Sequence, residues 1–476
     1  MSTLTTEKPE QYVSAAQIED ETIRPIPVTD RHGKSRDLFT IFFGTNIMIL
    51  SIVTGGLATA VFGQSLFFGA MAIIVGNLIG AIFMALHAAQ GPRLGVPQMV
   101  QTRGQFGSYG SVLIILVVIV MYLGWFTSIL AYAADSLATI IPGLPVPVGV
   151  VLLAVLSATA AIFGYRLIHA YAKVISIVSL IALIVTVFLL IFVHPVPAGF
   201  WSGALDLDGN LAAGDFNLAG FMFTLSAAAC WQIAYAPYVS DYSRYMPAAT
   251  GSKPAFWASY WGTNAGSILA MLLGAGLGLA VAGGDVVANL TAVAGPLAVP
   301  VVVIFTLGIA ATNAMNIYCG TLCTLTIGQT FADKWKPKAG TRAVVAAILA
   351  TLCAVLAIVF HADLNTNYIN FILLLLGALV PWTAVNLVDY YLVRHGDYQV
   401  DEFFRRDGGR YGYVNWAAVV CYVIGVAVQI PFINSLVFVG PIGGSLGFDI
   451  SWLIGLLVTS PLYYLVAKAF PNRVTA

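Results

Sequence analysis

Three tryptophans lie near the middle of long apolar stretches of this 476-residue chain: Trp125, Trp231 and Trp382. Tryptophans that anchor a protein in a membrane lie at the two interfaces, so anchoring does not explain these three. An indole face stacks well on a planar heteroaromatic ring, as aromatic side chains do on nucleobases. We therefore interpret Trp125 and Trp231 as candidate substrate-binding residues that could hold a ring between them. Packing within the protein is the alternative for both, and the better interpretation for Trp382.

The polar side chains at a similar depth are almost all neutral. Amides and hydroxyls present donors and acceptors together, which complements the edge of a heterocyclic base. Hydrogen bonding between helices is the alternative role for such residues. The candidates for contact with a substrate are Asn46, Tyr122, Gln232, Asn313 and Asn316.

Ionisable side chains are nearly absent from the apolar stretches, and this favours an uncharged substrate, because a charged one would be expected to meet a counter-charge. A proton-coupled carrier needs a titrating group, whereas Na⁺ needs only oxygen ligands. We therefore favour Na⁺ over H⁺, with the Thr312 hydroxyl and backbone carbonyls as ligands. Asp241 and Arg244 lie at the end of one stretch. They are candidates for an inner gate, and an ion pair at the surface is the alternative.

The composition indicates how these residues are held in place. Hydrophobic residues make up 59% of the chain and charged residues 9%, with a mean hydropathy of +0.89, whereas soluble domains carry about 25% charged residues. Runs of about 20 apolar residues can each cross ~30 Å of hydrocarbon as a helix, and their length excludes a β-barrel. We predict an all-α polytopic membrane protein with about twelve spans, at residues 38–60, 64–90, 109–140, 147–165, 171–194, 217–245, 254–282, 297–330, 342–361, 366–393, 413–434 and 448–468.

Charge placement predicts the orientation of these spans. All 21 Lys and Arg residues lie in the two tails or at the even-numbered connections, whereas the odd-numbered connections carry aspartates. By the positive-inside rule both termini are cytoplasmic and the number of spans is even. Residues 1–37 form a polar tail without the apolar core of a signal peptide. We expect this tail to be disordered and the protein to stay in the cytoplasmic membrane.

The spans divide into two sets of five with opposite orientation, at residues 38–194 and 217–393, which is a transporter architecture. A cytoplasmic loop at 394–412, two more spans at 413–468 and a short cytoplasmic tail at 469–476 follow. The first span of each set contains helix-breaking residues, among them Gly44 in the first and Pro237 in the second. Backbone groups freed by a break are tolerated in a membrane only where they are buried in protein or line a cavity. We predict a binding site at the two breaks, with simple kinks as the alternative.

Four segments resemble the purine/cytosine permease branch of the nucleobase–cation symporter-1 family: "FFGTNI", "GPRLGVPQMVQTRGQFG", "YLGWF" and "YAPYVSDYSRYMP". The resemblance extends over about residues 25–395. It implies a fold similar to LeuT, with a 5+5 inverted repeat and a planar base held between spans one, three, six, eight and ten.

The resemblance also implies roles for single residues. Trp125 matches the tryptophan of the third span, and the aromatic residue of the sixth span falls on Trp231 or on the neighbouring Gln232. Tyr122 replaces a glutamine that binds the base in cytosine permeases, and the region of Asn313 and Asn316 carries amides for the substrate. The implied cation ligands are the carbonyls of Gly44 and Ile47, together with Ala311 and Thr312.

We predict a symporter that imports a nucleobase or a similar planar heterocycle with Na⁺ or H⁺ by alternating access. A thiamine-precursor pyrimidine, a hydantoin or allantoin, or an amino acid is the alternative substrate. A membrane enzyme would need clustered Asp, His or Cys residues in its helices, and the sequence offers no such cluster. We expect a lipid bilayer around the protein, no cofactor and no nucleic-acid partner. The sequence leaves open which heterocycle is carried, which cation is coupled and what the oligomeric state is.

Overall fold

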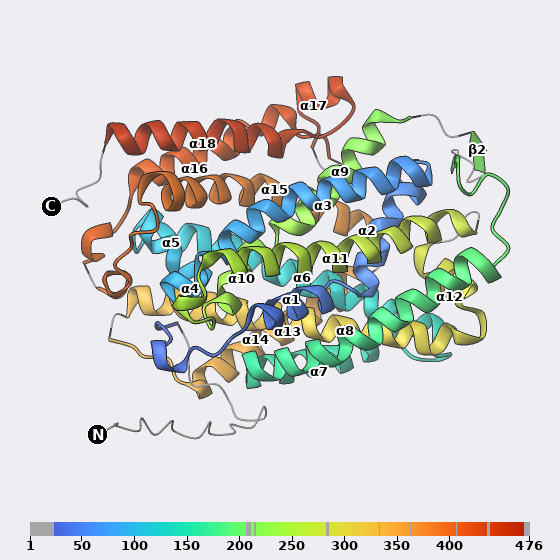
Figure 1. The fold of residues 1–476 in the computed structure, drawn as a ribbon, viewed down its shortest axis with the longest axis horizontal. Helices are drawn as coiled ribbons and strands as arrows, with labels where there is room; N and C mark the ends of the chain where they lie inside the picture. The colour runs from blue at the N-terminus through green and yellow to red at the C-terminus, as the bar shows by residue number, and fades with distance from the viewer. Residues whose placement is uncertain are drawn as a thin grey trace, which may run out of the picture.

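Long helices run side by side along the length of the protein in the computed structural model (Figure 1). We call the end that holds α4 (Gly91–Leu94) and α5 (Gln98–Phe106) the inner end. The opposite end, which holds β2 (Leu211–Ala213) and α12 (Val286–Ala294), is the outer end. The first described residues and the end of α18 (Ser451–Ala469) both lie at the inner end (Figure 1). The structure describes residues 23–205, 211–213, 216–281, 285–332, 334–361, 364–405, 407–435 and 438–470.

The first half of the chain contains eight α-helices, a π-helical turn at Leu189–Val193 and a two-stranded antiparallel hairpin. Their bounds are α1 Ser35–Gly44, α2 Ile49–Ala60, α3 Leu66–Ala88, α4 Gly91–Leu94, α5 Gln98–Phe106, α6 Gly110–Ile140, α7 Val146–Phe163, α8 Tyr165–Phe188, β1 Gly203–Leu205 and β2 Leu211–Ala213.

The second half is mainly helical in its described part, and its longest connection, residues 394–415, contains two 3-10 turns. Its helices are α9 Leu218–Ile233, α10 Ala236–Ser243, α11 Ser252–Ala280, α12 Val286–Ala294, α13 Ala298–Phe331, α14 Ala339–Phe360, α15 Leu364–Val388, α16 Trp416–Ala427, α17 Pro441–Leu446 and α18 Ser451–Ala469, with a π-helical turn at Asp389–Val393.

Ten helical segments in the described residues are long and apolar enough to cross a membrane. The pair α1 and α2 forms one more span with a bend of 60°, and the shorter apolar segment Trp416–Phe432 matches the eleventh predicted span. Together they are consistent with the predicted set of twelve, and the all-α polytopic fold is confirmed.

Residues 23–34, however, are not the free tail that the sequence predicts. Ile26 is buried and its amide donates to the Gly95 carbonyl at 3.1 Å, so this stretch packs on the inner end.

Both predicted breaks are present. The first separates α1 from α2 at residues 45–48, where Met48 is extended rather than helical. The second falls at Ala234 and Tyr235, and leaves α9 and α10 within one span. Pro237, the second residue of α10, has no amide hydrogen to donate and suits the first turn of a helix.

The helices pack mainly in two groups. The first group consists of α1, α2, α3, α9, α10 and α11, in which α2 packs along α11 and α9 along α3. The second group is built around α13, which packs against α6, α7, α8 and α14. Small residues allow the closest contacts, because a Cβ atom at Gly55 would lie 2.0 Å from the Met271 carbonyl oxygen. The two broken spans therefore lie in one group, facing α6 and α13 of the other.

Candidate functional site

A small cavity of about 20 Å³ lies between the two helix groups, at the level of both breaks. The first group contributes residues from the two breaks and the second contributes residues of α6 and α13. None of the lining residues, all in the described part of the chain, carries a charged group. They are Met48, Trp125, Ile129, Trp231, Ala234, Tyr235, Tyr238, Thr312 and Asn316.

Trp231 is fixed in the cavity wall by Asn46. The indole Nε1 donates to Asn46 Oδ1 at 2.6 Å, and the Asn46 amide nitrogen donates to the Phe42 carbonyl at 2.6 Å and to the Thr263 hydroxyl at 3.3 Å. Asn46 does not line the cavity. The structure therefore places this predicted substrate ligand behind Trp231, where it orients the indole.

Trp125 and Trp231 contact each other edge to face in the cavity wall, with ring centroids 5.3 Å apart and ring planes at 80°. Two indoles that sandwich a flat ring must lie parallel and roughly 7 Å apart, which is twice the ~3.5 Å contact distance. The predicted parallel sandwich is therefore not the arrangement in this structure. The Trp125 Nε1 is buried and has no hydrogen-bond partner, so it is a donor still available at the cavity wall.

The side of the cavity toward the inner end is closed by Tyr238 and Asn316. The Tyr238 hydroxyl donates to Asn316 Oδ1, and Asn316 Nδ2 donates to Asn313 Oδ1 at 3.2 Å. Asn313 does not line the cavity, and neither does Tyr122, whose hydroxyl donates to the Pro237 carbonyl at 2.9 Å. Of these predicted ligands only Asn316 reaches the cavity, and the other two support its wall.

Gln232 lies outside the cavity. Its Nε2 donates to Asn77 Oδ1 at 2.6 Å and to Ser267 Oγ at 2.7 Å, and its Oε1 accepts from the Thr263 hydroxyl at 2.7 Å. One step along a helix turns the side chain by about 100°, so Trp231 faces the cavity and Gln232 faces α3 and α11. The prediction that Gln232 contacts the substrate does not agree with this placement.

The first break brings backbone carbonyls to α13. The Thr312 hydroxyl donates to the Thr45 carbonyl at 2.7 Å, and the Ile47 carbonyl oxygen lies 3.0 Å from the position of a Cβ atom at Gly308. The Gly44 carbonyl instead accepts from the Ile47 amide at 3.4 Å. The Thr45 carbonyl is thus a candidate cation ligand that the sequence analysis did not name.

The other two predicted cation ligands, Gly44 and Ala311, are both buried in this structure. A Cβ atom at Gly44 would lie 2.8 Å from the Ala172 carbonyl, so its small size allows α1 to approach α8. Ala311 is fully buried within α13. A cation at this break would be held most simply by Thr312 with the Thr45 and Ile47 carbonyls, which is the type of ligand set that unwound helices offer.

Asp241 and Arg244 are both buried, so the alternative of an ion pair at the surface is wrong. Asp241 Oδ1 accepts a hydrogen bond from the backbone amide of Gln98 at 2.7 Å and so caps the first turn of α5. Arg244 Nη2 donates to the Tyr318 hydroxyl of α13 at 3.2 Å. These contacts attach α10 to α5 and α13 on the inner side of the cavity.

Five lining residues were not predicted: Met48, Ile129, Ala234, Tyr235 and Tyr238. The two tyrosines flank the second break, and the aromatic residues in "YAPY" are the signal that could have found them. The three apolar residues resemble every other residue of the spans, so the sequence carries no signal for them.

Comparison with known proteins agrees with this architecture. Residues 25–455 match the family model for permeases of cytosine and purines, uracil, thiamine and allantoin. The chain belongs to this family. A candidate purine-cytosine permease of Bacillus subtilis, YxlA, is 41% identical over 95% of this chain and 96% of its own length. The yeast purine-cytosine permease FCY21 is 24% identical over 92% of this chain and 85% of its own length.

The fold also matches a solved structure. Mhp1, a nucleobase–cation-symport-1 family transporter with bromovinylhydantoin bound in a closed conformation, superposes with a TM-score of 0.76 over 95% of this chain and 97% of its own, at 21% identity. The predicted membership of the nucleobase–cation symporter-1 family is confirmed. The protein is a multi-pass membrane permease for a small heterocycle and not an enzyme.

Proposed function

We propose that this permease imports a nucleobase of the cytosine or purine type by cation symport. The observation that carries the proposal is a small cavity at two helix breaks with an indole from each helix group and no charged lining residue. An uncharged, planar ring suits these walls, because it can stack on an indole without leaving a charge unpaired. The free Trp125 Nε1 donor and the Asn316 amide would serve acceptors on the ring edge.

The coupling ion is Na⁺ in this proposal, bound between the first break and α13. Thr312 both lines the cavity and contacts the Thr45 carbonyl, so an ion here would link the position of the break to the substrate. The proton is the alternative ion. It is less favoured because the cavity wall contains no carboxylate or histidine among the described residues.

Alternating access would arise from movement of the two helix groups about the cavity. On the inner side α10 is held to the other group through Tyr122, Asn316 and Tyr318. On the outer side the Tyr368 hydroxyl of α15 lies 2.7 Å from the Thr54 hydroxyl of α2. Opening one set of contacts while the other holds would expose the cavity to one side only. A cytoplasmic inner end with both termini in the cytoplasm is part of the proposal, and the positive-inside rule supports it because the Lys and Arg residues lie in the tails and the even-numbered connections.

Other planar heterocycles are the main alternative substrates, because Mhp1 was solved with a hydantoin compound bound and the family description includes thiamine and allantoin. A thiamine-precursor pyrimidine, a hydantoin or allantoin would meet the same walls. An amino acid is disfavoured, because its ammonium and carboxylate groups would both need partners that the uncharged lining does not provide.

Equilibrium binding to purified protein tests the proposal directly. Tritiated cytosine, adenine, hypoxanthine, uracil, allantoin and a hydantoin are measured with NaCl and with choline chloride. We expect one nucleobase to bind with Na⁺ dependence, and Trp125→Ala to abolish binding. The matched control is Trp452→Phe, which alters a buried indole hydrogen-bonded to Ser226 outside the cavity lining. Binding of hydantoin or allantoin alone would support the alternative, and binding that survives Trp125→Ala would contradict the site.

A further inference from the structure

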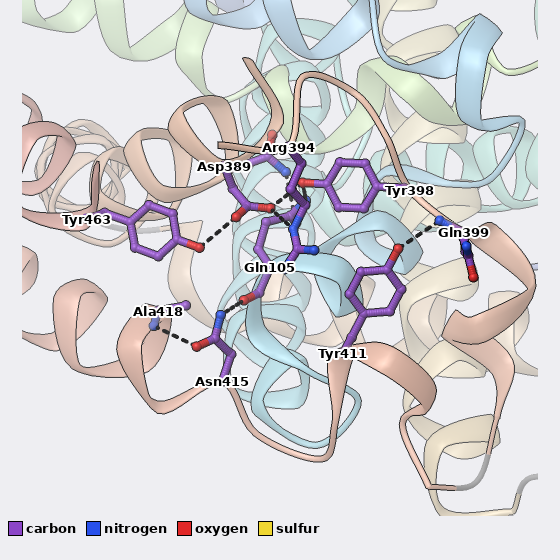
Figure 2. Close-up of polar contacts among 10 residues, drawn as sticks. Gln105, Asp389, Arg394, Tyr398, Gln399, Tyr411, Asn415, Ala418 and Tyr463 are labelled. Atoms are coloured by element: carbon purple, nitrogen blue, oxygen red, sulfur yellow. Dashed lines mark hydrogen bonds and ion pairs between the residues drawn. The ribbon is translucent and has the colours of Figure 1, made fainter. Parts of the chain in front are cut away.

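A buried carboxylate that the binding site does not use lies at the inner end of α15. Asp389 begins the π-helical turn that ends this span and is 1% exposed. It accepts three hydrogen bonds, from Arg394 Nε at 2.9 Å, from the Tyr463 hydroxyl at 2.8 Å and from the Tyr398 hydroxyl (Figure 2). The donors come from the connection after α15 and from α18, so Asp389 joins the end of α15 to both.

The hydrogen bonds continue from Asp389 toward the first helix group. The Tyr398 hydroxyl accepts from Gln105 Nε2 of α5 at 2.9 Å, and Gln105 Oε1 accepts from Asn386 Nδ2 at 3.2 Å. Asn386 Oδ1 in turn accepts from Gln90 Nε2, just after α3, at 2.9 Å. Asn386 and Asp389 are three residues apart and so share one face of α15. The chain of contacts therefore runs from α18, outside the two five-span sets, to α3.

Mechanical support alone is a poor explanation for this arrangement. Withdrawing a carboxylate and a guanidinium from water is costly, and apolar side chains of similar volume often hold helices together at least as well. Polar contacts differ from apolar packing in being directional, so a small displacement of one partner releases them. All five residues of this hydrogen-bonded series are buried: Gln90, Asn386, Gln105, Tyr398 and Asp389. Each of them therefore depends on its neighbours in the series for its hydrogen bonds.

We infer that Asp389 is a positioning residue for the transport cycle. It orients the inner end of α15 so that Asn386 can hold Gln90, and this contact helps to close the cavity toward the inner side. Arg394 packs over the Tyr411 ring at 5.1 Å and so holds the connection against the same cluster. The inference assigns a role to α18, whose Tyr463 fixes Asp389, and it rests on the alternating access proposed above.

The test measures access to the cavity from the inner side without any substrate. Ala234 lines the cavity, and Ala234→Cys supplies a reporter thiol for a membrane-impermeant maleimide added to inside-out vesicles. The five native cysteines are all buried, and protein without the reporter gives their background labelling. Asp389→Asn and Tyr463→Phe remove hydrogen-bond partners at one end of this series of contacts. Gln90→Met removes the hydrogen-bond donor at its other end.

We expect Asp389→Asn and Tyr463→Phe to raise the labelling rate about tenfold, the scale of losing one hydrogen bond to a charged group. Gln90→Met removes a bond between two amides and should raise the rate about fivefold. Asp389→Asn combined with Gln90→Met should raise it little further, because both break the same contact. Asp407→Asn, in an exposed pair 2.7 Å from Arg405, and Tyr464→Phe, next to Tyr463 on α18, are the matched controls and should leave the rate unchanged.

Three results would overturn the inference: unchanged labelling in folded variants, an equal rise in the controls, or independent effects of Asp389→Asn and Gln90→Met. If Asp389→Asn does not fold, Tyr463→Phe and Gln90→Met decide the question, because both leave the carboxylate paired with Arg394. The failure of the proposed function is a separate result, because it would appear as absent heterocycle binding while the labelling rates still report on closure.

Discussion

Replacing Asn46 by alanine should weaken substrate binding through Trp231, although Asn46 does not line the cavity. The replacement removes the acceptor 2.6 Å from the Trp231 Nε1 and leaves the indole free to change its orientation. Binding must then order this side chain again, at a cost of about 1 kcal/mol. A cost of this size corresponds to about a fivefold higher Kd.

A double-mutant cycle isolates this coupling from the other contacts of Asn46. Trp231→Phe keeps an aromatic face but has no N–H group, so Asn46→Ala in that background should raise the Kd little further. The bonds from Asn46 to the Phe42 carbonyl and the Thr263 hydroxyl are lost in both backgrounds and cancel. The Kd is measured by equilibrium binding of the tritiated substrate.

Trp452→Phe is the control for this cycle, because its indole also donates a buried hydrogen bond, to Ser226 at 2.9 Å, but lies outside the cavity lining. It should leave the Kd unchanged. An equal loss of affinity from Asn46→Ala in both backgrounds would refute the reasoning and would return Asn46 to the role of a direct ligand.

Three further changes test other parts of the structure. Thr312→Ala should raise the Na⁺ concentration for half-maximal substrate binding about tenfold, and Thr312→Ser should restore it, because only the hydroxyl donates to the break. Gly55→Ala should lower the melting temperature, because its Cβ would lie 2.0 Å from the Met271 carbonyl oxygen and overpacking of this kind costs about 1–3 kcal/mol. Gly340→Ala is the control and should leave the melting temperature unchanged, because the space around its Cβ is open. Tyr368→Phe should increase maleimide labelling of the cavity from the outer side, by removing the contact with Thr54; unchanged labelling would show that this contact does not close the cavity.

The fold could be predicted from the sequence because its main signals are local. The apolar runs correspond to the helices, and the helix-breaking residues around Gly44 and Pro237 fall at the observed breaks. The stretch before α1 was mispredicted as free, because polar composition does not reveal that Ile26 is buried against the loop at Gly95.

The site could be predicted only in part, because its details depend on helix rotation and on packing between distant segments. Trp231 and Gln232 are adjacent and both polar enough to bind a base, yet only one of them faces the cavity. Met48 and Ile129 line it although their types are common throughout the spans. The Thr45 carbonyl could not be chosen over that of Gly44 without the backbone geometry of the break.

Uptake into proteoliposomes tests the central claim most directly. A radiolabelled panel of nucleobases and other planar heterocycles is offered under an inward Na⁺ gradient and, separately, under a proton gradient, with wild-type protein and Trp125→Ala. We predict accumulation of a nucleobase driven by the Na⁺ gradient and abolished by Trp125→Ala. No uptake of any heterocycle under either gradient by folded protein, or uptake unaffected by the substitution, would contradict the account.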